Sequence, residues 1–236
     1  MDDVFWYTKT MAISSMCIYC GKAADTREHI PPKQFFKGTV DKPLITVPSC
    51  NACNAGFQKD EDFFRQFYAS MLMARSSEAK KLMEGEVSRS ILRTPALGHQ
   101  MFSQMKLVDQ YTKSGLYKGK MTMYTISDSD KERINRVVTK VIKGLFFHKF
   151  GQTIPEDWIT KIIWITPQVE KEQKLDEMGK QPYWRVIKED TFAYWVIHVP
   201  ETFQSVWLLD FFKIPLFYVL VLDKKNSPRR IKDIQP

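Results

Sequence analysis

The sequence lacks a long apolar run, internal repeats and low-complexity tracts. No stretch approaches the ~18–20 apolar residues that a bilayer-spanning helix needs. The N-terminal stretch MDDVFWYTKTMAISSM lacks the basic-then-apolar pattern of a signal peptide. The composition also lacks the biases of disordered, collagen-like or coiled-coil chains. We therefore expect a cytoplasmic globular protein with no membrane partner.

Acidic residues are fewer than basic residues. The net charge is +8, of which residues 1–95 contribute +2 and residues 96–236 contribute +6. A basic surface favours polyanions, and nucleic acid is the commonest of these in a cell. The alternative is that the charge only maintains solubility.

Cysteine is absent outside one short region. All four cysteines form two C-x-x-C pairs separated by 29 residues, Cys17 with Cys20 and Cys50 with Cys53. In a reducing compartment such pairs are more often metal ligands than disulfides. Four thiolates satisfy zinc without an open position, so the pattern predicts a structural zinc site. Two redox-active dithiols are the alternative, but no thioredoxin-like βαβ pattern surrounds them.

The first part of the chain predicts a small hairpin followed by helices. TREHI (26–30) is typical of a strand that Pro31 and Pro32 end, and LITV (44–47) predicts a second strand. A helix is expected from Asp60, where the acidic residues 60–62 suit the helix dipole or, less favourably, bind a metal. A second helix is expected over 77–92, and RTPALG (93–98) marks the best boundary. We therefore divide the chain into regions 1–95 and 96–236.

The second part predicts an α+β region with an antiparallel sheet and one long helix. The stretches around KSG (113–115) indicate a β-hairpin. Ser129 and Glu132 form a potential capping box for a helix over about 130–150, which Gly151 would end. Strands are expected at about 160–165, 183–188, 191–199, 204–212 and 216–222.

The pattern C-x-x-C…E-H-I-P-P…V-P-x-C-x-x-C-N, over roughly residues 15–72, resembles the HNH endonucleases. These belong to the His-Me finger (ββα-metal) group, and the similarity is greatest to the branch whose ββα element is held by four zinc-bound cysteines. The resemblance implies a zinc-stapled, treble-clef-like N-terminal module. It also implies that Glu28 and Asn54 ligate a catalytic Mg²⁺ or Mn²⁺ and that His29 is the general base.

This assignment is chemically reasonable, because histidine titrates near neutral pH and a hard ion prefers oxygen ligands. Two departures count against it. Glu28 stands where the family more often has Asp. The family's middle Asn is missing near Pro43, and Asp41 is the nearest replacement. Structural roles remain open for each residue: a surface histidine, a solvated glutamate and a helix-capping asparagine.

Basic residues indicate where nucleic acid would bind. On the helix expected over 130–150, the spacing places one row of cations opposite an apolar stripe: Arg133, Arg136, Lys140 and Lys143. Three more lie beside the motif: Arg27, Lys33 and Lys37. Ordinary solvated surfaces are the alternative for both groups.

The leading hypothesis is a metal-dependent endonuclease that hydrolyses DNA, with RNA not excluded. One rival is a non-catalytic zinc module that binds nucleic acid, which the missing middle Asn favours. Another is a partner-activated effector subunit of a phage-defence system. A homodimer or another protein partner is also possible within these hypotheses.

Overall fold

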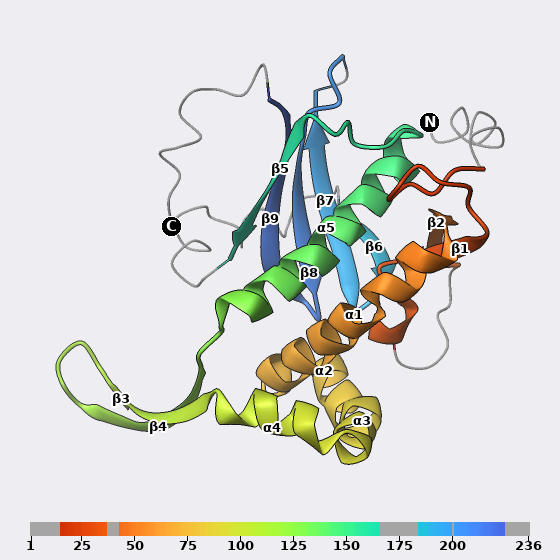
Figure 1. Cartoon of the computed structure of the whole chain (residues 1–236). Helices are drawn as coiled ribbons and strands as arrows, with labels where there is room; N and C mark the ends of the chain where they lie inside the picture. Colours follow the sequence, from red (N-terminus) through yellow and green to blue (C-terminus); the bar gives the residue numbers. More distant parts are fainter. Residues whose placement is uncertain (1–14, 37–42, 166–183, 200, 225–236) are drawn as a thin grey trace.

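The computed structural model describes residues 15–36, 43–165, 184–199 and 201–224 (Figure 1). Its first part is a β-hairpin followed directly by a helix. Strands β1 (Thr26–Ile30) and β2 (Ile45–Ser49) pair antiparallel, with Glu28 opposite Val47 and His29 opposite Thr46. Helix α1 (Asn51–Leu72) begins two residues after β2 ends, and a short 3-10 turn, η2 (Lys33–Phe35), follows β1. The predicted pair of strands is therefore confirmed.

Helix α1 begins earlier than the sequence led us to expect. Cys50 is its N-cap, and its Sγ accepts a hydrogen bond from the backbone N–H of Cys53 at 3.4 Å. The expected start at Asp60 is wrong, because the second C-x-x-C pair itself forms the first turn. Asp60 and Glu61 are instead buried in the middle of the helix, away from the positive end of its dipole.

Four helical segments follow α1. The helix predicted over 77–92 is observed as α2 (Ser77–Leu82), a π-helical segment η3 (Met83–Val87) and α3 (Ser88–Arg93). The helical conformation is interrupted at Thr94, within the predicted boundary, but Pro95 then starts helix α4 (Pro95–Ser103). Proline suits this first helical position because no intrahelical acceptor awaits its missing N–H.

The predicted hairpin and long helix come next. Strands β3 (Met105–Tyr111) and β4 (Tyr117–Tyr124) form a two-stranded antiparallel ribbon. Helix α5 (Asp128–Phe150) ends at Gly151, which has a left-handed φ of 69°. The capping box at Ser129 is wrong. Ser127 is the N-cap, and its hydroxyl accepts from the backbone N–H of Asp130 at 3.2 Å.

The remaining strands form one antiparallel sheet in the order β5-β9-β8-β7-β6, as predicted. Their bounds are Trp158–Trp164 (β5), Arg185–Lys188 (β6), Phe192–His198 (β7), Ser205–Phe211 (β8) and Ile214–Asp223 (β9). The mixed helix and strand content with antiparallel sheets agrees with the predicted class. Within the described residues, no helix has the length and apolarity to cross a membrane.

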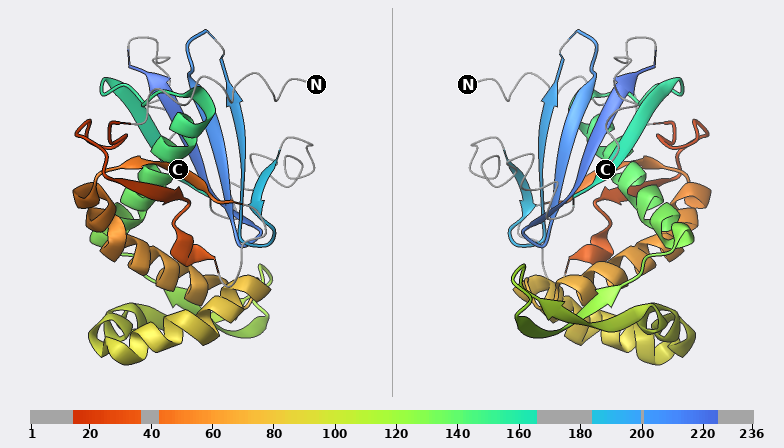
Figure 2. Two further views of the ribbon diagram at one scale, coloured as in Figure 1. Left: turned by 90° about the vertical axis from the view of Figure 1, so that its right-hand side faces the viewer. Right: turned by 90° about the vertical axis from the view of Figure 1, so that its left-hand side faces the viewer.

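One hydrophobic core joins the two predicted regions. Helix α5 lies between the five-stranded sheet and the β1–β2 hairpin (Figure 2). On α1, Phe64 packs on Phe211 of the sheet at a ring distance of 5.1 Å. On α5, the ring centroid of Phe146 lies 6.3 Å from that of Trp158 on β5. Buried residues on both sides of residue 95 belong to the same cluster, so the hairpin that carries Glu28 and His29 depends on the second region for support.

The closest approach of α5 to the hairpin depends on Gly144. A Cβ at this position would overlap the fully buried side chain of Ile30, the residue after His29. We expect Gly144→Ala to destabilise the fold by about 1–3 kcal/mol through overpacking, despite the better helix propensity of alanine. Urea denaturation measures this. Gly56→Ala in α1 is the matched control: it meets no atom within 4 Å and should be neutral or slightly stabilising. A Gly144→Ala protein as stable as its parent would contradict this packing.

Candidate metal centre and catalytic residues

The four cysteines converge on one point. Their Sγ atoms all lie within 4.8 Å of one another, and the Sγ atoms of Cys20 and Cys50 are 3.6 Å apart. A tetrahedral zinc with bonds of about 2.3 Å needs Sγ separations of roughly 3.8 Å. The donor set and its spacing therefore fit the predicted zinc. Cys17 and Cys20 come from the loop before β1, so the ion would tie this loop to the start of α1.

The backbone around the cluster favours a thiolate at Cys17. Burial raises the pKa of Cys17, but backbone hydrogen bonds with Cys50, Tyr19 and Cys20 outweigh this and lower it to about 6. Burial and the neighbouring thiols raise the pKa of Cys53. Zinc binding would therefore release protons from the cluster, since all four ligands must be thiolates.

Glu28 and His29 point to opposite faces of the hairpin. Strand alternation puts Glu28 on the buried inner face, with 6% of its surface exposed, and leaves His29 half-buried on the outer face. On the outer face, Arg27 donates to Thr46 through Nε at 3.0 Å to Oγ1 and through Nη2 at 3.2 Å to the carbonyl oxygen. Thr46 is the cross-strand neighbour of His29. The imidazole of His29 thus lies beside a guanidinium, and no described residue hydrogen-bonds to it.

Asn54 lies on the same side of the hairpin as Glu28. Its Nδ2 donates to Oγ1 of Thr26 at 3.4 Å, and Thr26 shares the inner face with Glu28. Among the described residues, Oδ1 of Asn54 has no hydrogen-bond partner. The structure therefore brings Asn54 and Glu28 to one face and leaves His29 on the other.

The carboxylate of Glu28 faces a buried cation. Lys140 of α5 is 1% exposed, and its Nζ lies 3.1 Å from Oε2 of Glu28. The same ammonium forms an ion pair with Glu61 of α1, whose Oε2 accepts from Gln34 at 3.1 Å. The Lys140 ammonium also lies 5.0 Å from the centroid of the Phe57 ring.

We call Glu28, Lys140 and Glu61 the buried triad. Burial raises the pKa of Glu61, although Lys140 acts against this. Oε1 of Glu28 accepts from the backbone N–H of His29 at 3.0 Å. Its Oε2 is in ion-pair contact with Lys140 but accepts no aligned hydrogen bond from the described residues. The triad links β1, α1 and α5 through charge.

The predicted row of cations on α5 is not one solvent-facing surface. Arg136 pairs with both carboxylate oxygens of Asp60, and Arg133 donates to Oδ1 of Asp60 at 3.0 Å. Burial raises the pKa of Asp60, but the two guanidiniums outweigh it and lower the pKa below its usual value. Lys140 is inside the protein. The prediction that these four cations form one exposed row is therefore wrong. Among the described residues, only Lys143 of the four has no carboxylate partner.

A cleft of about 450 Å³ lies between α5, the start of α1 and the loop before β1 that carries Cys17 and Cys20, which we call the zinc loop after its predicted ligand. Arg136, Lys140 and Lys143 line it, together with Tyr19 and Phe57. The hydroxyl of Tyr19 is buried and has no partner among the described residues. Burial and the charges of Glu28 and Glu61 raise its pKa. The cleft thus opens beside the buried triad.

The other predicted cations lie near the hairpin. Arg27 is exposed on the outer face, and Lys33 is exposed at the start of η2. Lys37 and Asp41 lie outside the described residues.

The buried triad was not predicted from the sequence. One signal was present: Gly144 follows Lys140 by one helical turn, and a glycine inside a strong helix marks a close approach of another backbone or side chain. That approach is to β1.

Comparisons with protein-family models, curated proteins and solved structures found no match for the chain.

Proposed function

We propose that the protein is a zinc-stapled, metal-dependent endonuclease of the HNH kind that hydrolyses phosphodiester bonds in DNA. The observation that carries the proposal is the order hairpin, cysteine pair and helix. A zinc held by the cysteine cluster would fix the strand bearing Glu28 and His29 against the first turn of α1, which bears Asn54. This is the element order that a ββα-metal site requires.

The donors offered for a second ion fit a hard divalent cation by type. Oε2 of Glu28 lacks an aligned hydrogen bond, and Oδ1 of Asn54 is unpartnered while its Nδ2 is anchored to Thr26. Two oxygen donors suit Mg²⁺ or Mn²⁺, which retain several waters. When bound, the ion would supply positive charge to the phosphate and the leaving oxygen.

The residues of the chain would supply the remaining steps. His29 would accept a proton from the attacking water; because its half-buried imidazole lies on the hairpin face opposite Glu28 and Asn54, the phosphodiester would have to reach around the edge of the hairpin. The imidazole has no competing partner among the described residues. Arg27, on the same face, would hold a phosphate oxygen through its guanidinium. Lys143, beside the cleft, would contact the nucleic acid backbone.

We expect the zinc-loaded protein to cut DNA with Mg²⁺ or Mn²⁺ and to stop when excess chelator removes these ions. His29→Ala should lower the cleavage rate by about 10²–10⁴-fold, the usual contribution of a general base. A gel assay on plasmid, single-stranded and branched substrates measures both. His99→Ala, on the exposed side of α4, is the matched control and should cut as its parent does. If His29→Ala cuts at the parental rate, the assigned role is wrong.

A non-catalytic module that binds nucleic acid is the second candidate, and the buried triad favours it. The Lys140 ammonium already compensates the charge of Glu28, so the carboxylate has a cation partner without a metal. DNA binding without cleavage under every metal condition would support this candidate.

A further inference from the structure

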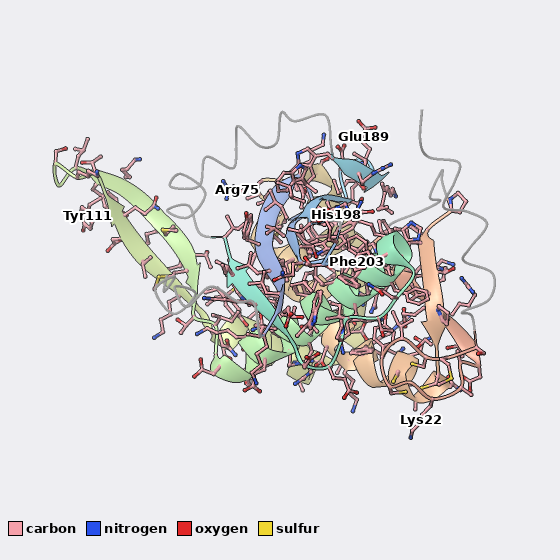
Figure 3. All side chains as sticks on the ribbon, turned by 90° about the horizontal axis from the view of Figure 1, so that it is seen from above. Lys22, Arg75, Tyr111, Glu189, His198 and Phe203 are labelled. Carbon is pink, nitrogen blue, oxygen red and sulfur yellow. The ribbon has the colours of Figure 1, made fainter. Side chains whose placement is uncertain are left out.

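The β3–β4 ribbon, residues 105–124, stands away from the body of the protein (Figure 1); we call it the arm. Its two strands pair only with each other among the described strands. Tyr124 anchors its base through a ring contact of 4.8 Å with Phe67. Figure 3 places Tyr111, at the far part of the arm, at the opposite end of the molecule from Lys22 of the zinc loop. A lone two-stranded ribbon is marginally stable in water, so a binding partner would stabilise it.

The surface of the arm combines cations with apolar side chains. Its sequence contains four lysines and one acidic residue, Asp109. The lysines are all exposed, and none forms a salt bridge within the described part of the chain: Lys106, Lys113, Lys118 and Lys120. Between them lie exposed large apolar residues: Leu107, Tyr111, Leu116, Tyr117, Met121 and Met123. The rings of Tyr111 and Tyr117 are 5.5 Å apart, and Tyr117 donates to Asp109 at 3.3 Å.

The distribution of charge argues against a second copy of the chain as the partner. The centres of protein interfaces are depleted in lysine, whereas lysines are spread along both strands of the arm. The chain as a whole carries +8, so two copies meeting at their arms would also bring like charges together. Unpaired lysines interleaved with tyrosine and aliphatic side chains are suited to phosphates flanking base edges.

We propose that the arm binds in the major groove of duplex DNA. This groove admits a two-stranded β-ribbon, whereas the major groove of duplex RNA is too deep and narrow for side chains to read. The lysines contact phosphates on the groove walls, and the tyrosines and methionines contact base edges and thymine methyl groups. The inference shares with the proposed function only the class of ligand, and it uses no residue of the candidate catalytic site.

The test is a binding titration by fluorescence anisotropy with the full-length, zinc-loaded protein. The probe is a labelled duplex DNA, in buffer without magnesium or manganese so that no strand is cut. The arm variant replaces all four of its lysines by glutamine. The matched control replaces four exposed lysines on other elements by glutamine: Lys80, Lys81, Lys131 and Lys213. Both variants therefore lose the same charge.

Each lost phosphate contact should reduce the slope of log affinity against log salt by about 0.9. We expect the arm variant to lose about 2–4 from this slope and to bind on the order of 100-fold more weakly at low salt. The control should change affinity only a few-fold. A second variant, Tyr111→Ser with Tyr117→Ser, should weaken binding by about tenfold with the salt slope unchanged, because it removes base contacts only. The parent should also prefer duplex DNA to duplex RNA of the same sequence.

Equal losses in the arm variant and its control would overturn the proposal, as would a parent that binds no duplex DNA. A parental dimer that the tyrosine variant converts to a monomer in light scattering would show that the arm covers a second copy instead. Cleavage assays decide the proposed function separately. If the arm binds DNA in a protein that never cuts, this inference stands. If the protein cuts normally without its arm lysines, only the proposal that the arm binds DNA is overturned.

Discussion

Cys50→Ser should yield a protein that no longer retains zinc stoichiometrically and whose N-terminal hairpin is unfolded. Cys50 has two roles, as one of four converging thiols and as the N-cap of α1. Structural zinc contributes roughly 10–16 kcal/mol of apparent binding free energy in small zinc modules at neutral pH. This is as large as the whole free energy of unfolding of a typical domain, about 5–15 kcal/mol. Metal analysis and hydrogen exchange of residues 15–60 measure the loss.

Asn51→Ala is the matched control for this substitution. Asn51 is the next residue, its side chain is exposed, and its backbone N–H, which the substitution keeps, donates to Asp25 at 2.7 Å. This variant should keep its zinc and its parental melting temperature. A Cys50→Ser protein that melts like its parent without zinc would show that the hairpin needs no metal. Because β1 packs on α5 at Gly144 and Lys140, we expect the unfolding to weaken the second region as well.

Local patterns accounted for most of the elements. β-Branched and aromatic content predicted the five-stranded sheet, turn residues predicted the β3–β4 hairpin, and Gly151 ended the long helix where expected. The start of α1 was misplaced because the acidic run at 60–62 imitates a helix N-terminus, whereas the actual cap is a cysteine thiol. Capping by a cysteine thiol is not among the ordinary capping preferences.

The candidate site was harder to predict because its key contacts are long-range. The four cysteines were grouped correctly by their spacing. Helical spacing placed Lys140 opposite the apolar stripe, yet it lies about one helical turn from both Val137 and Gly144, and the hairpin packs at Gly144. Its partners Glu28 and Glu61 are 112 and 79 positions away in the sequence. Apart from Gly144 one turn later, nothing local distinguishes such a buried lysine from a solvated one.

Lys140→Met should destabilise the protein by about 3–5 kcal/mol at neutral pH. Removing one partner of a buried ion pair leaves an uncompensated charge, and here two carboxylates lose the same cation. Lys143→Met, one turn further along α5, is the matched control. It removes a lysine with no carboxylate partner in the described part of the chain and should change stability by at most about 0.5 kcal/mol. Urea unfolding measures both.

The same variant should respond to pH in a defined direction. Burial already raises the pKa of Glu61 in the parent, and the loss of Lys140 raises it further. A carboxyl whose pKa is higher in the folded state than in the unfolded state binds more protons when folded, so stability falls as pH rises. Lys140→Met should therefore lose stability more steeply than its parent as the pH rises above the usual pKa of a glutamate. Adding Glu28→Gln and Glu61→Gln should remove the excess slope and restore much of the stability, since no charge of the buried triad then remains.

Lys140→Met also separates the two candidate functions. If a divalent ion binds Glu28 in the parent, it must share that carboxylate with the ammonium, and removing the ammonium should tighten Mn²⁺ binding. An increase of tenfold would correspond to about 1.4 kcal/mol. Electron paramagnetic resonance titration of zinc-loaded protein measures this without any cleavage. Glu28→Gln in the same background should abolish the gain. The parent could bind no Mn²⁺ while the Lys140→Met variant binds it through Glu28. That result would mean that the lysine has replaced the ion, which favours the non-catalytic module.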